Sequence, residues 1–421
     1  MEIRQLTTEE FDNFAKNYPY KNFYQTAEYG TLMDRHAFND YYLGLIDDAN
    51  NLVAATLILV NRVVMGYKWG YCPRGYLIDY KNEDLVRTFT QLLTDFLKKR
   101  NFMFIKIDPQ IIYKSHENTG EVNALVDNEI IYNTLLNCGY QHNGFNLNFE
   151  NLKPRWSAVL TCKPEDKIFN LFSKEIRNKI RKADNRGVEV IKGEPENIKE
   201  FYNLISYKNE KRKLNYYLDM FEIFGKSDMF DIFFARINTS KYIEKSKNLY
   251  EKEEIRNNEL NEELEENLDS NNKNSIIKRK MNSDTLLNNY KQSVIKSAEL
   301  FKNNPVGIVV AACAVVKYNG EIFFLIDGID NNYRDYCPNH YMKYILMDMY
   351  HNQGYNRFNL NGISGDFTKG SKYYDLTRFK LGFGCHVEEY LGEFTLVINK
   401  SKTNNYNRIN PIIEWLNTPV L

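Results

Sequence analysis

The chain has 421 residues, which is enough for two or three domains of roughly 150 residues each. Hydrophobic residues make up 43% and aromatic residues 14%, and this composition excludes a disordered chain. The 55 Lys and Arg balance the 55 Asp and Glu, so a bulk electrostatic attraction to nucleic acid is not expected, although local charged patches can still bind it.

The cysteines and the apolar runs bear on metal sites and on location. The six cysteines form no Cys-x-x-Cys pair, which argues against a zinc site, and no other metal site is expected. The chain starts without the pattern of a signal peptide, and its longest apolar run, 52–60, is too short to span a bilayer. We therefore expect a cytoplasmic protein with reduced thiols, peripheral to the cytoplasmic membrane at most.

The first third of the chain predicts an α/β unit. Thr7 and Glu10 have the spacing of a capping box, which predicts a helix that begins there. Two apolar, β-branched runs at 41–46 and 52–60 flank a polar turn and predict a hairpin. The further expected elements are a helix after 23–29, a strand end and turn at 69–76, a helix at 83–100, a buried strand at 102–107 and a helix at 122–136. This order is typical of a GNAT-like unit.

A similar order recurs in the second half. It comprises an amphipathic helix within 165–187, a strand at 188–191, a helix at 198–207, a strand at 230–237, strands at 306–318 and 321–328, a helix at 338–353 and a strand at 357–360. We predict an α/β (α+β) fold of two GNAT-like domains, residues 1–152 and residues 153–239 with 304–398, followed by a tail at 399–421. Ligands are expected in the cleft between these domains.

Residues 240–303 interrupt the second domain. From 251 to 266, eight Glu face one Lys and one Arg, net −6, and from 278 to 302 six Lys and Arg face one Asp and one Glu, net +4. Apolar residues with helical spacing are Ile255, Leu260, Leu264, Leu268, Ile277, Met281, Tyr290, Val294 and Ala298, around a polar break at 269–275. The pattern predicts an antiparallel coiled-coil hairpin with arms of opposite charge, and a disordered charged loop is the alternative.

A basic helix is expected at 173–187. An apolar stripe from Phe169 to Ala183 forms one side, and the outer faces carry cations that include Arg177, Lys179, Arg181 and Lys182. A second basic cluster at 208–213 contains Lys211 and Arg212. Such clusters suit a polyanion such as RNA or a pyrophosphate, because each cation contacts one phosphate. A solvated helix face is the alternative.

The run 377–394 is the most informative part of the chain. It places Lys380 between Phe379 and the step Gly382-Phe-Gly384, ahead of two strand-like pieces. The glycines remove side chains, so another backbone or a ligand can come close. The alternative is a bulged β-hairpin with a surface lysine.

Two further polar residues are candidates for a site. Asp108 ends a buried strand, and Arg74 occupies a Pro-Arg-Gly turn that can aim it into a cleft. For both residues, a purely structural role is as compatible with the sequence as a role in a site.

Several familiar catalytic patterns are missing. The six histidines show no triad or metal spacing, and no GxxxxGK[ST] phosphate loop occurs. A coenzyme A loop would have the form Arg/Gln-x-x-Gly-x-Gly/Ala, but Arg378 precedes Gly382 by one residue too many. The halves are thus GNAT-like without the cofactor loop.

In order and spacing, several short motifs together resemble the Fem family of peptidoglycan bridge aminoacyltransferases. They are Phe-Tyr-Gln-Thr at 23–26, Pro-Arg-Gly-Tyr-Leu-Ile-Asp-Tyr at 73–80, Ile-Asp-Pro at 107–109, Ile-Arg-Asn-Lys-Ile-Arg-Lys at 176–182, Gly-Val-Glu-Val at 187–190, Tyr333 to Tyr341, Asn-Gly-Ile-Ser-Gly at 361–365 and Phe-Lys-Leu-Gly-Phe-Gly at 379–384. The resemblance covers nearly the whole chain. It implies two GNAT-like domains with a coiled-coil arm.

The resemblance also implies an activity and its partners. The enzyme would transfer an amino acid, with Gly, Ser and Ala as the leading candidates, from aminoacyl-tRNA to the side-chain amine or growing bridge of a peptidoglycan precursor such as lipid II. Aminoacyl-tRNA would be a co-substrate, and no cofactor is implied. Other Fem-type transferases are possible partners, and a monomer or weak dimer is our default.

Site residues carry over by position. Phe379 and Lys380 match the Phe-Lys pair near the transfer site, and Asp108 matches a carboxylate proposed as base. Lys211 or Arg212 falls where a basic residue contacts the acceptor phosphate, and Arg35, Arg74 and Tyr341 are assigned to substrate binding. Position 33 often holds a lysine in the family, but this chain has Met33 with Arg35 nearby. The family's contact with the acceptor diphosphate is therefore in question at this position, and a different acceptor is one interpretation.

These residues suggest a mechanism in which Lys380 stabilises the oxyanion formed when an amine attacks the tRNA ester. Phe379 would stack on the terminal adenine of tRNA, and Asp108 or the substrate would take the proton. Two other readings stay open. One is an acyl-coenzyme A N-acyltransferase on the same scaffold, and the other is a non-catalytic, tRNA-binding scaffold protein of the bridge-forming machinery.

Overall fold

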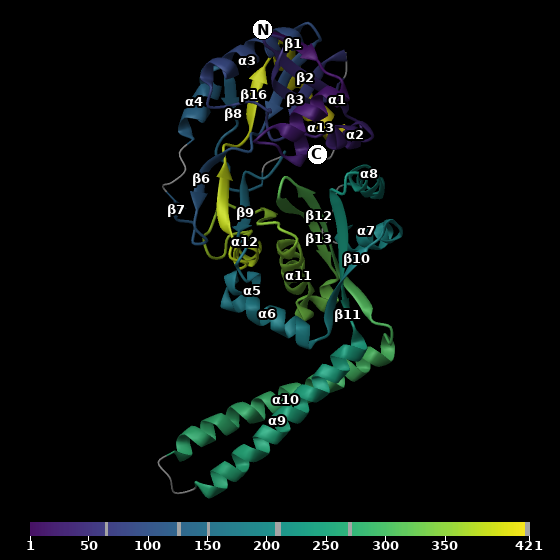
Figure 1. The fold of residues 1–421 in the computed structure, drawn as a ribbon, viewed down its shortest axis with the longest axis vertical. Helices are drawn as coiled ribbons and strands as arrows, with labels where there is room; N and C mark the ends of the chain where they lie inside the picture. Colours follow the sequence, from purple (N-terminus) through teal and green to yellow (C-terminus); the bar gives the residue numbers. More distant parts are fainter. Residues whose placement is uncertain (64–65, 124–127, 150–151, 207–211, 268–271, 417–421) are drawn as a thin grey trace.

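The computed structural model describes residues 1–63, 66–123, 128–149, 152–206, 212–267 and 272–416. Two mixed β-sheets with helices on their faces form the body, and a long pair of helices projects from it (Figure 1). The predicted α/β class with an inserted helical arm is confirmed.

The first sheet has seven strands within the described residues. Their spatial order is β1 (Glu2–Gln5), β2 (Asn39–Ile46), β3 (Leu52–Arg62), β4 (Lys68–Cys72), β5 (Phe102–Ile107), β16 (Phe394–Val397) and β8 (Tyr140–His142). The helices of this part are α1 (Thr8–Asn17), α2 (Ala27–Asp34), α3 (Glu83–Lys98), α4 (Glu129–Asn137) and α13 (Lys400–Leu416).

The second sheet has nine strands within the same described ranges. Their order is β10 (Val188–Gly193), β11 (Phe230–Ile237), β12 (Ile308–Tyr318), β13 (Glu321–Ile329), β14 (Arg357–Gly362), β9 (Trp156–Thr161), β15 (His386–Tyr390), β6 (Ile112–His116) and β7 (Val122–Asn123). Its helices are α5 (Ile168–Leu171), α6 (Lys174–Asn185), α7 (Ile198–Ser206), α8 (Leu214–Gly225), α11 (Pro338–Asn352) and α12 (Tyr374–Leu381).

The two sheets exchange strands. β6 and β7 come from the first third of the chain but pair in the second sheet, whereas β16 returns to the first sheet and lies between β5 and β8. Each of these segments therefore pairs with the sheet of the other predicted domain. The domain bounds themselves remain a prediction. A buried apolar cluster that contains residues from α1, α2, α7 and α8 also joins the two halves.

Local sequence signals produce several of these elements as predicted. Thr7 and Glu10 form the capping box: Glu10 N donates to Thr7 Oγ1 at 3.1 Å, and Thr7 N donates to Glu10 Oε2 at 2.8 Å. The hairpin of β2 and β3 is present, and Asp47 accepts from the backbone of Ala49 and Asn51 in its turn. Each of these contacts spans only a few residues.

One helix is shorter than predicted, and several elements, β9 and α8 among them, were not predicted. The helix expected at 122–136 begins only at Glu129, because Val122 pairs with His116 and extends the second sheet. The helix α8 had no predicted counterpart. Residues 124–127 lie outside the described residues.

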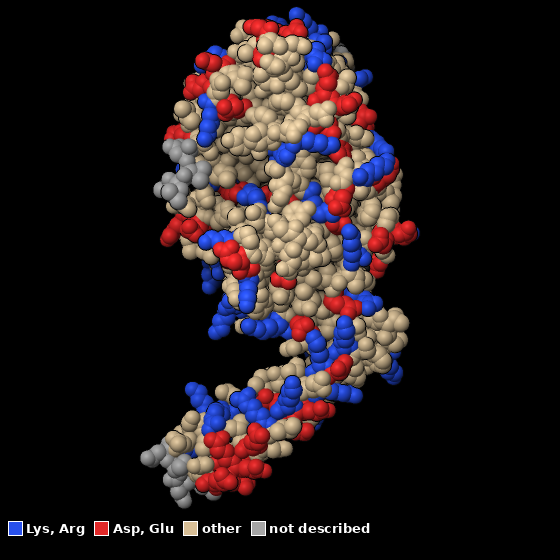
Figure 2. All heavy atoms as spheres, viewed as in Figure 1, with Lys and Arg blue, Asp and Glu red and all other residues tan. Residues whose placement is uncertain are grey.

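The arm consists of α9 (Thr239–Glu266) and α10 (Lys273–Asn303), packed side by side as the predicted hairpin (Figure 1). Figure 2 shows acidic side chains gathered over the far part of α9 and basic ones over α10, as the charge pattern predicts. The alternative, a disordered charged loop, is therefore wrong for the described part of this segment.

The predicted apolar seam of the arm is confirmed only in part. Leu260 is buried, but Ile255 and Met281 are 61% and 65% exposed, and Leu268 lies outside the described residues. The half-buried members of the predicted seam are Leu264, Ile277, Tyr290 and Val294. The buried positions between the helices are mostly polar. Ser283 Oγ donates to Glu253 at 2.6 Å and accepts from Asn257 Nδ2 at 3.1 Å. Buried polar groups need partners, so these bonds fix the register of the hairpin.

Candidate functional site

Lys380 lies near the end of α12 and is half-buried. Its Nζ donates a hydrogen bond of 2.7 Å to the carbonyl oxygen of Gly362, the last residue of β14. The alternative of a β-hairpin with a surface lysine is wrong, because β15 and β16 follow as two strands but pair in different sheets. The helix and the strand end together set the direction of the ammonium.

The glycines after Lys380 bring α12 against the basic helix. Ser173, the N-cap of α6, donates its backbone N–H to Gly382 O at 2.9 Å. Gly384 has φ +77°, and a Cβ there would lie 2.5 Å from Leu171 O. The predicted close approach of another backbone is confirmed, and that backbone is the corner between α5 and α6.

Phe379 meets a histidine that sequence reasoning did not select. The rings of Phe379 and His340 lie 4.8 Å apart and nearly perpendicular, at the start of α11. His340 Nε2 is buried and has no hydrogen-bond partner within the described residues. Burial, and after it the nearby charges of Lys179 and Lys343, lower the pKa of His340 to about 4, so its ring is neutral at pH 7.

The predicted phosphate-binding cations lie together on α6. Figure 2 shows basic side chains gathered at this edge of the body. Arg177 donates to Asn170 O at 3.3 Å, Lys179 pairs with Glu175 at 2.7 Å, Arg181 lies over the ring of Phe169, and Lys182 is exposed. Tyr341 of α11 shares a groove with Arg181, and its hydroxyl donates to Asp184 at 3.4 Å. Their roles remain predictions.

Asp108 and Arg74 form a second centre, at the end of β5. Asp108 is 2% exposed, and its Oδ1 accepts from Arg74 N at 2.7 Å and from the Tyr71 hydroxyl at 3.0 Å. Its Oδ2 has no hydrogen-bond partner within the described residues but lies 3.7 Å from Arg74 Nη1. Burial raises the pKa of Asp108, although Arg74 opposes this shift.

Lys153 is a buried cation next to this centre, and no sequence pattern pointed to it. Its Nζ lies 4.4 Å from the centre of the Tyr24 ring, and the residue is 5% exposed. Burial, and after it the positive charge of Arg212, lower the pKa of Lys153 to about 7, although Asp108 opposes this shift. The charge of this lysine therefore changes near neutral pH.

A cavity of about 200 Å³ opens between the two sheets. Arg74 and Tyr24 line one side, and a row of paired charges from the second sheet lines the other. In that row Arg357 makes two hydrogen bonds of 2.8 and 2.7 Å to Glu388 and also binds Glu321. Burial works to raise the pKa of Glu388, but hydrogen bonds from His386, Arg357 and Tyr390 outweigh it and hold the pKa at about 2. The cavity is thus lined by charges that are already paired.

The two centres do not touch, but one short path connects them. Arg74 Nη2 donates to Pro154 O at 3.2 Å. The ring of Pro154 packs so closely on Gly362 that a Cβ there would lie 2.5 Å from it, and Gly362 O accepts from Lys380. Asp108 and Lys380 therefore lie at opposite ends of one continuous contact path.

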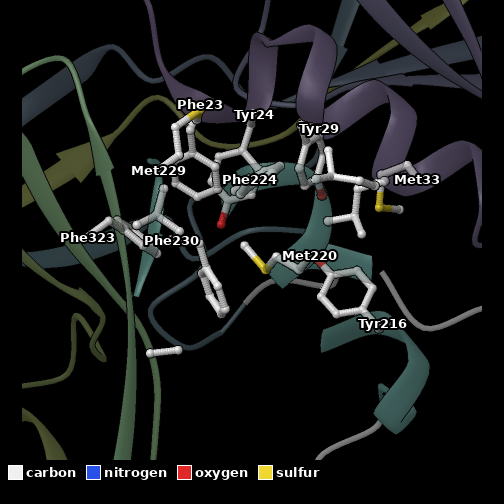
Figure 3. Packing of buried hydrophobic residues seen from close by; sticks show 14 of the residues in the cluster. Phe23, Tyr24, Tyr29, Met33, Tyr216, Met220, Phe224, Met229, Phe230 and Phe323 are labelled. Atoms are coloured by element: carbon white, nitrogen blue, oxygen red, sulfur yellow. The ribbon is translucent and has the colours of Figure 1, made fainter. Parts of the chain in front are cut away.

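The remaining candidates lie where α2 meets α8. Met33 is 4% exposed and packs in a buried cluster with Tyr216 and Met220 (Figure 3). Arg35 pairs with Asp219 at 2.7 Å and with Glu222 at 2.8 Å, so it ties the two helices together. Its predicted substrate contact therefore competes with two ion pairs.

The second basic cluster is described only in part. The guanidinium of Arg212 lies 4.8 Å from the centre of the Tyr216 ring. Lys211 falls outside the described residues, so its predicted role has no structural counterpart here.

The described residues contain neither a metal-binding cluster nor a membrane-spanning helix. Across the described ranges, no group of three or more His, Cys, Asp or Glu side chains is arranged to hold a metal ion. Among the helices in the same ranges, none combines the length and the apolar character needed to cross a bilayer.

Comparison with known proteins gives a consistent result over the full length. The family model described as the FemAB family matches residues 6–410. Aminoacyltransferase FemA from Staphylococcus aureus strain MRSA252 is 25% identical over 427 residues, which cover 98% of this chain and 99% of FemA, and FemA from strain N315 gives the same values. A crystal structure of FemX superimposes with a TM-score of 0.73 at 20% identity, covering 97% of this chain and 100% of that one.

Proposed function

The chain belongs to the FemAB family, and from this we propose that it is an aminoacyltransferase that builds interpeptide bridges on a peptidoglycan precursor. The proposed donor is aminoacyl-tRNA carrying Gly, Ser or Ala, and the proposed acceptor is an amine of the stem peptide, or of the growing bridge, on a lipid-linked precursor. No cofactor takes part in this proposal.

The observation that carries the proposal is the contact between α6 and α12. The Phe379–Lys380 pair lies on a short helix that is fastened to a helix rich in Arg and Lys. A polyanion bound along α6 would bring its end to this pair, because phosphates follow a row of cations. Phe379 can then stack on an unpaired base, a contact worth roughly 1–3 kcal/mol.

Lys380 is proposed to stabilise the transition state. The amine attacks the carbonyl carbon of the tRNA ester, the carbonyl oxygen gains negative charge, and the tRNA hydroxyl leaves when the tetrahedral intermediate collapses. The ammonium of Lys380 is held by Gly362 O and provides a fixed positive charge for that oxygen. Since the ester is already activated, no covalent enzyme intermediate is needed.

Asp108 is better suited to hold Arg74 than to take the proton. Its carboxylate is buried, and the cavity is lined by Arg74 and not by Asp108. We propose that Asp108 positions the guanidinium, which faces the acceptor in the cavity. The proton of the attacking amine then passes to the substrate or to solvent.

We propose that this chain binds the acceptor without the cation that the family often has at position 33. Met33 packs in an apolar cluster, so its side chain provides no cation for a diphosphate. The half-buried Arg212, whose guanidinium lies against Tyr216 of the same cluster, is the cation proposed to replace it.

A transfer assay tests the proposal. The protein would be incubated with lipid II carrying zero to three bridge residues and with tRNA charged separately with radiolabelled Gly, Ser or Ala. Label that moves from one tRNA to one acceptor is the expected result. Transfer from acyl-coenzyme A, but not from any charged tRNA, would support the N-acyltransferase alternative, and no transfer by the folded protein would support the scaffold alternative.

A further inference from the structure

Residues 143–149, Asn-Gly-Phe-Asn-Leu-Asn-Phe, carry an exposed aromatic row. We give this name to Phe145, Leu147 and Phe149, which are 44%, 52% and 39% exposed. Asparagines separate the three side chains, and the segment contains no charged residue. An apolar row of this kind on a protein surface is a typical sign of an interaction site.

The backbone of this segment is firmly held on its inner side. Leu147 O accepts from Gly365 N at 2.6 Å and from Ser364 Oγ at 3.0 Å, and Asn146 O accepts from Trp156 Nε1 at 2.9 Å. These two carbonyl oxygens are thus satisfied inward, while the three apolar side chains stay partly exposed. This arrangement presents the row at a fixed place.

A tyrosine and a lysine flank each end of the row. At one end Tyr113 stacks on Phe145 with ring centres 5.1 Å apart, and Lys114 Nζ lies 5.1 Å from the Tyr113 ring. At the other end the ring centres of Tyr373 and Phe149 lie 4.8 Å apart, and Lys372 Nζ lies 5.1 Å from the centre of the Tyr373 ring. Both lysines are exposed.

This order of side chains matches the layers of a membrane surface. Phenylalanine and leucine enter the apolar boundary, tyrosine rings favour the headgroup level, and lysines reach anionic phosphates. A protein partner would not require cations at both ends of an uncharged row. We propose that the aromatic row, with Lys114 and Lys372, docks the protein on an anionic lipid surface.

The proposed docking surface is joined to the candidate site. Phe149 packs against Gly362, where a Cβ would lie 2.9 Å from its ring, and Gly362 O is the acceptor for Lys380. Ser364, whose hydroxyl donates to Leu147 O, also donates its backbone N–H to the Thr377 hydroxyl of α12 at 3.3 Å. If the acceptor is lipid-linked, as the proposed function holds, its lipid would lie at the docking surface and its reactive amine at the adjacent Lys380 site.

Vesicle flotation tests the docking without any need for catalysis. The full chain would be floated with vesicles of 70% phosphatidylcholine and 30% phosphatidylglycerol, and with pure phosphatidylcholine. We expect binding to the anionic vesicles, a loss of at least about 10-fold in the variant F145S/L147S/F149S, and a loss of about 3–10-fold in K114Q/K372Q. Equal flotation of the wild type and the triple variant would overturn the proposal.

The arm offers a matched control. The variant I255S/M281S/I295S removes three exposed apolar side chains of the arm and should float like the wild type. Thermal unfolding would show that each variant is folded. Absence of wild-type binding to either vesicle would overturn the proposal, as would self-association that the aromatic-row triple variant abolishes, since a second copy would then cover the row.

Activity separates this proposal from the proposed function. The variant F145S/L147S, which leaves the contact of Phe149 with Gly362 intact, should lose transfer to acceptor embedded in anionic vesicles while it keeps the wild-type KM and kcat for a soluble, nucleotide-linked acceptor. An equal loss on both acceptors would contradict a docking role. If neither acceptor is used by the wild type, the proposed function fails, whereas flotation still decides the docking.

Discussion

The ammonium of Lys380 lies 2.7 Å from the carbonyl oxygen of Gly362, so the last turn of α12 is tied to the end of β14. This bond directs a cation from a helix to the carboxyl end of an inner strand of the second sheet. It also connects the candidate transfer site, through Pro154, to the Arg74–Asp108 pair.

Replacement of Lys380 by methionine should lower kcat by about 10²–10³-fold, because the cation for the developing oxyanion is lost. KM for the charged tRNA should change little. Steady-state kinetics with the amino acid that gives transfer would measure both. Lys81→Met, at an exposed lysine, is the control, and a loss of less than a few-fold in K380M would contradict the oxyanion role.

The cations of α6 should contribute to tRNA binding through phosphate contacts. Lys182→Ala should weaken binding and reduce the slope of log affinity against log salt by about one unit. Titration of labelled tRNA at several salt concentrations gives this slope. Lys199 is exposed on α7 and serves as the control, and an unchanged slope in K182A would show that α6 does not contact phosphates there.

Lys153 should make stability depend on pH. Its pKa is lowered to about 7 in the folded protein and is near ~10.4 when unfolded, so the unfolded chain binds more protons between these values. The resulting destabilisation is complete below about pH 7 and disappears as the pH rises toward the unfolded pKa.

Lys153→Met should therefore raise the unfolding temperature at pH 6.5, and the gain should shrink at pH 9.5. Thermal unfolding at both values measures the difference, with exposed Lys98→Met as the control. A gain that is the same at both pH values would show that the charge of Lys153 is not the cause.

Two glycines with positive φ offer a matched pair. Gly370→Ala should cost about 1 kcal/mol of unfolding free energy, because φ is +88° but a Cβ there meets nothing within 4 Å. Gly384→Ala should cost about 1–3 kcal/mol more, because its Cβ would meet Leu171 O.

Urea unfolding gives both free energies, and G384A should also lower kcat, because the clash displaces α12. Equal costs at the two glycines would mean that α12 and the α5–α6 corner adjust without strain. A normal kcat in a clearly destabilised G384A would mean that the position of α12 is not critical.

Sequence reasoning succeeded where the signal was local. The capping box of Thr7, the hairpin turn at Asp47 and the glycines after Lys380 each act over a few residues, and the structure confirms all three. The basic helix was also found, because its charge and its apolar stripe share one period.

It failed where a distant partner decides the structure. Val122 lies in a strand because it pairs with β6, and no residue of its own segment indicates that pairing. The arm contains enough apolar residues to suggest a seam, yet Glu253, Asn257 and Ser283 occupy the contact because they satisfy one another. Lys153 and His340 gain their unusual environments only from side chains far along the chain.

The position of β16 has a consequence for how the protein is made. This strand, Phe394–Val397, forms an inner strand of the first sheet, with β5 and β8 as its neighbours. During synthesis, residues of β5 and β8 leave the ribosome more than 250 residues before their partner, as the separation of Tyr140–His142 from Phe394–Val397 shows. The first sheet therefore stays open, with unpaired strand edges at β5 and β8, until β16 has been translated.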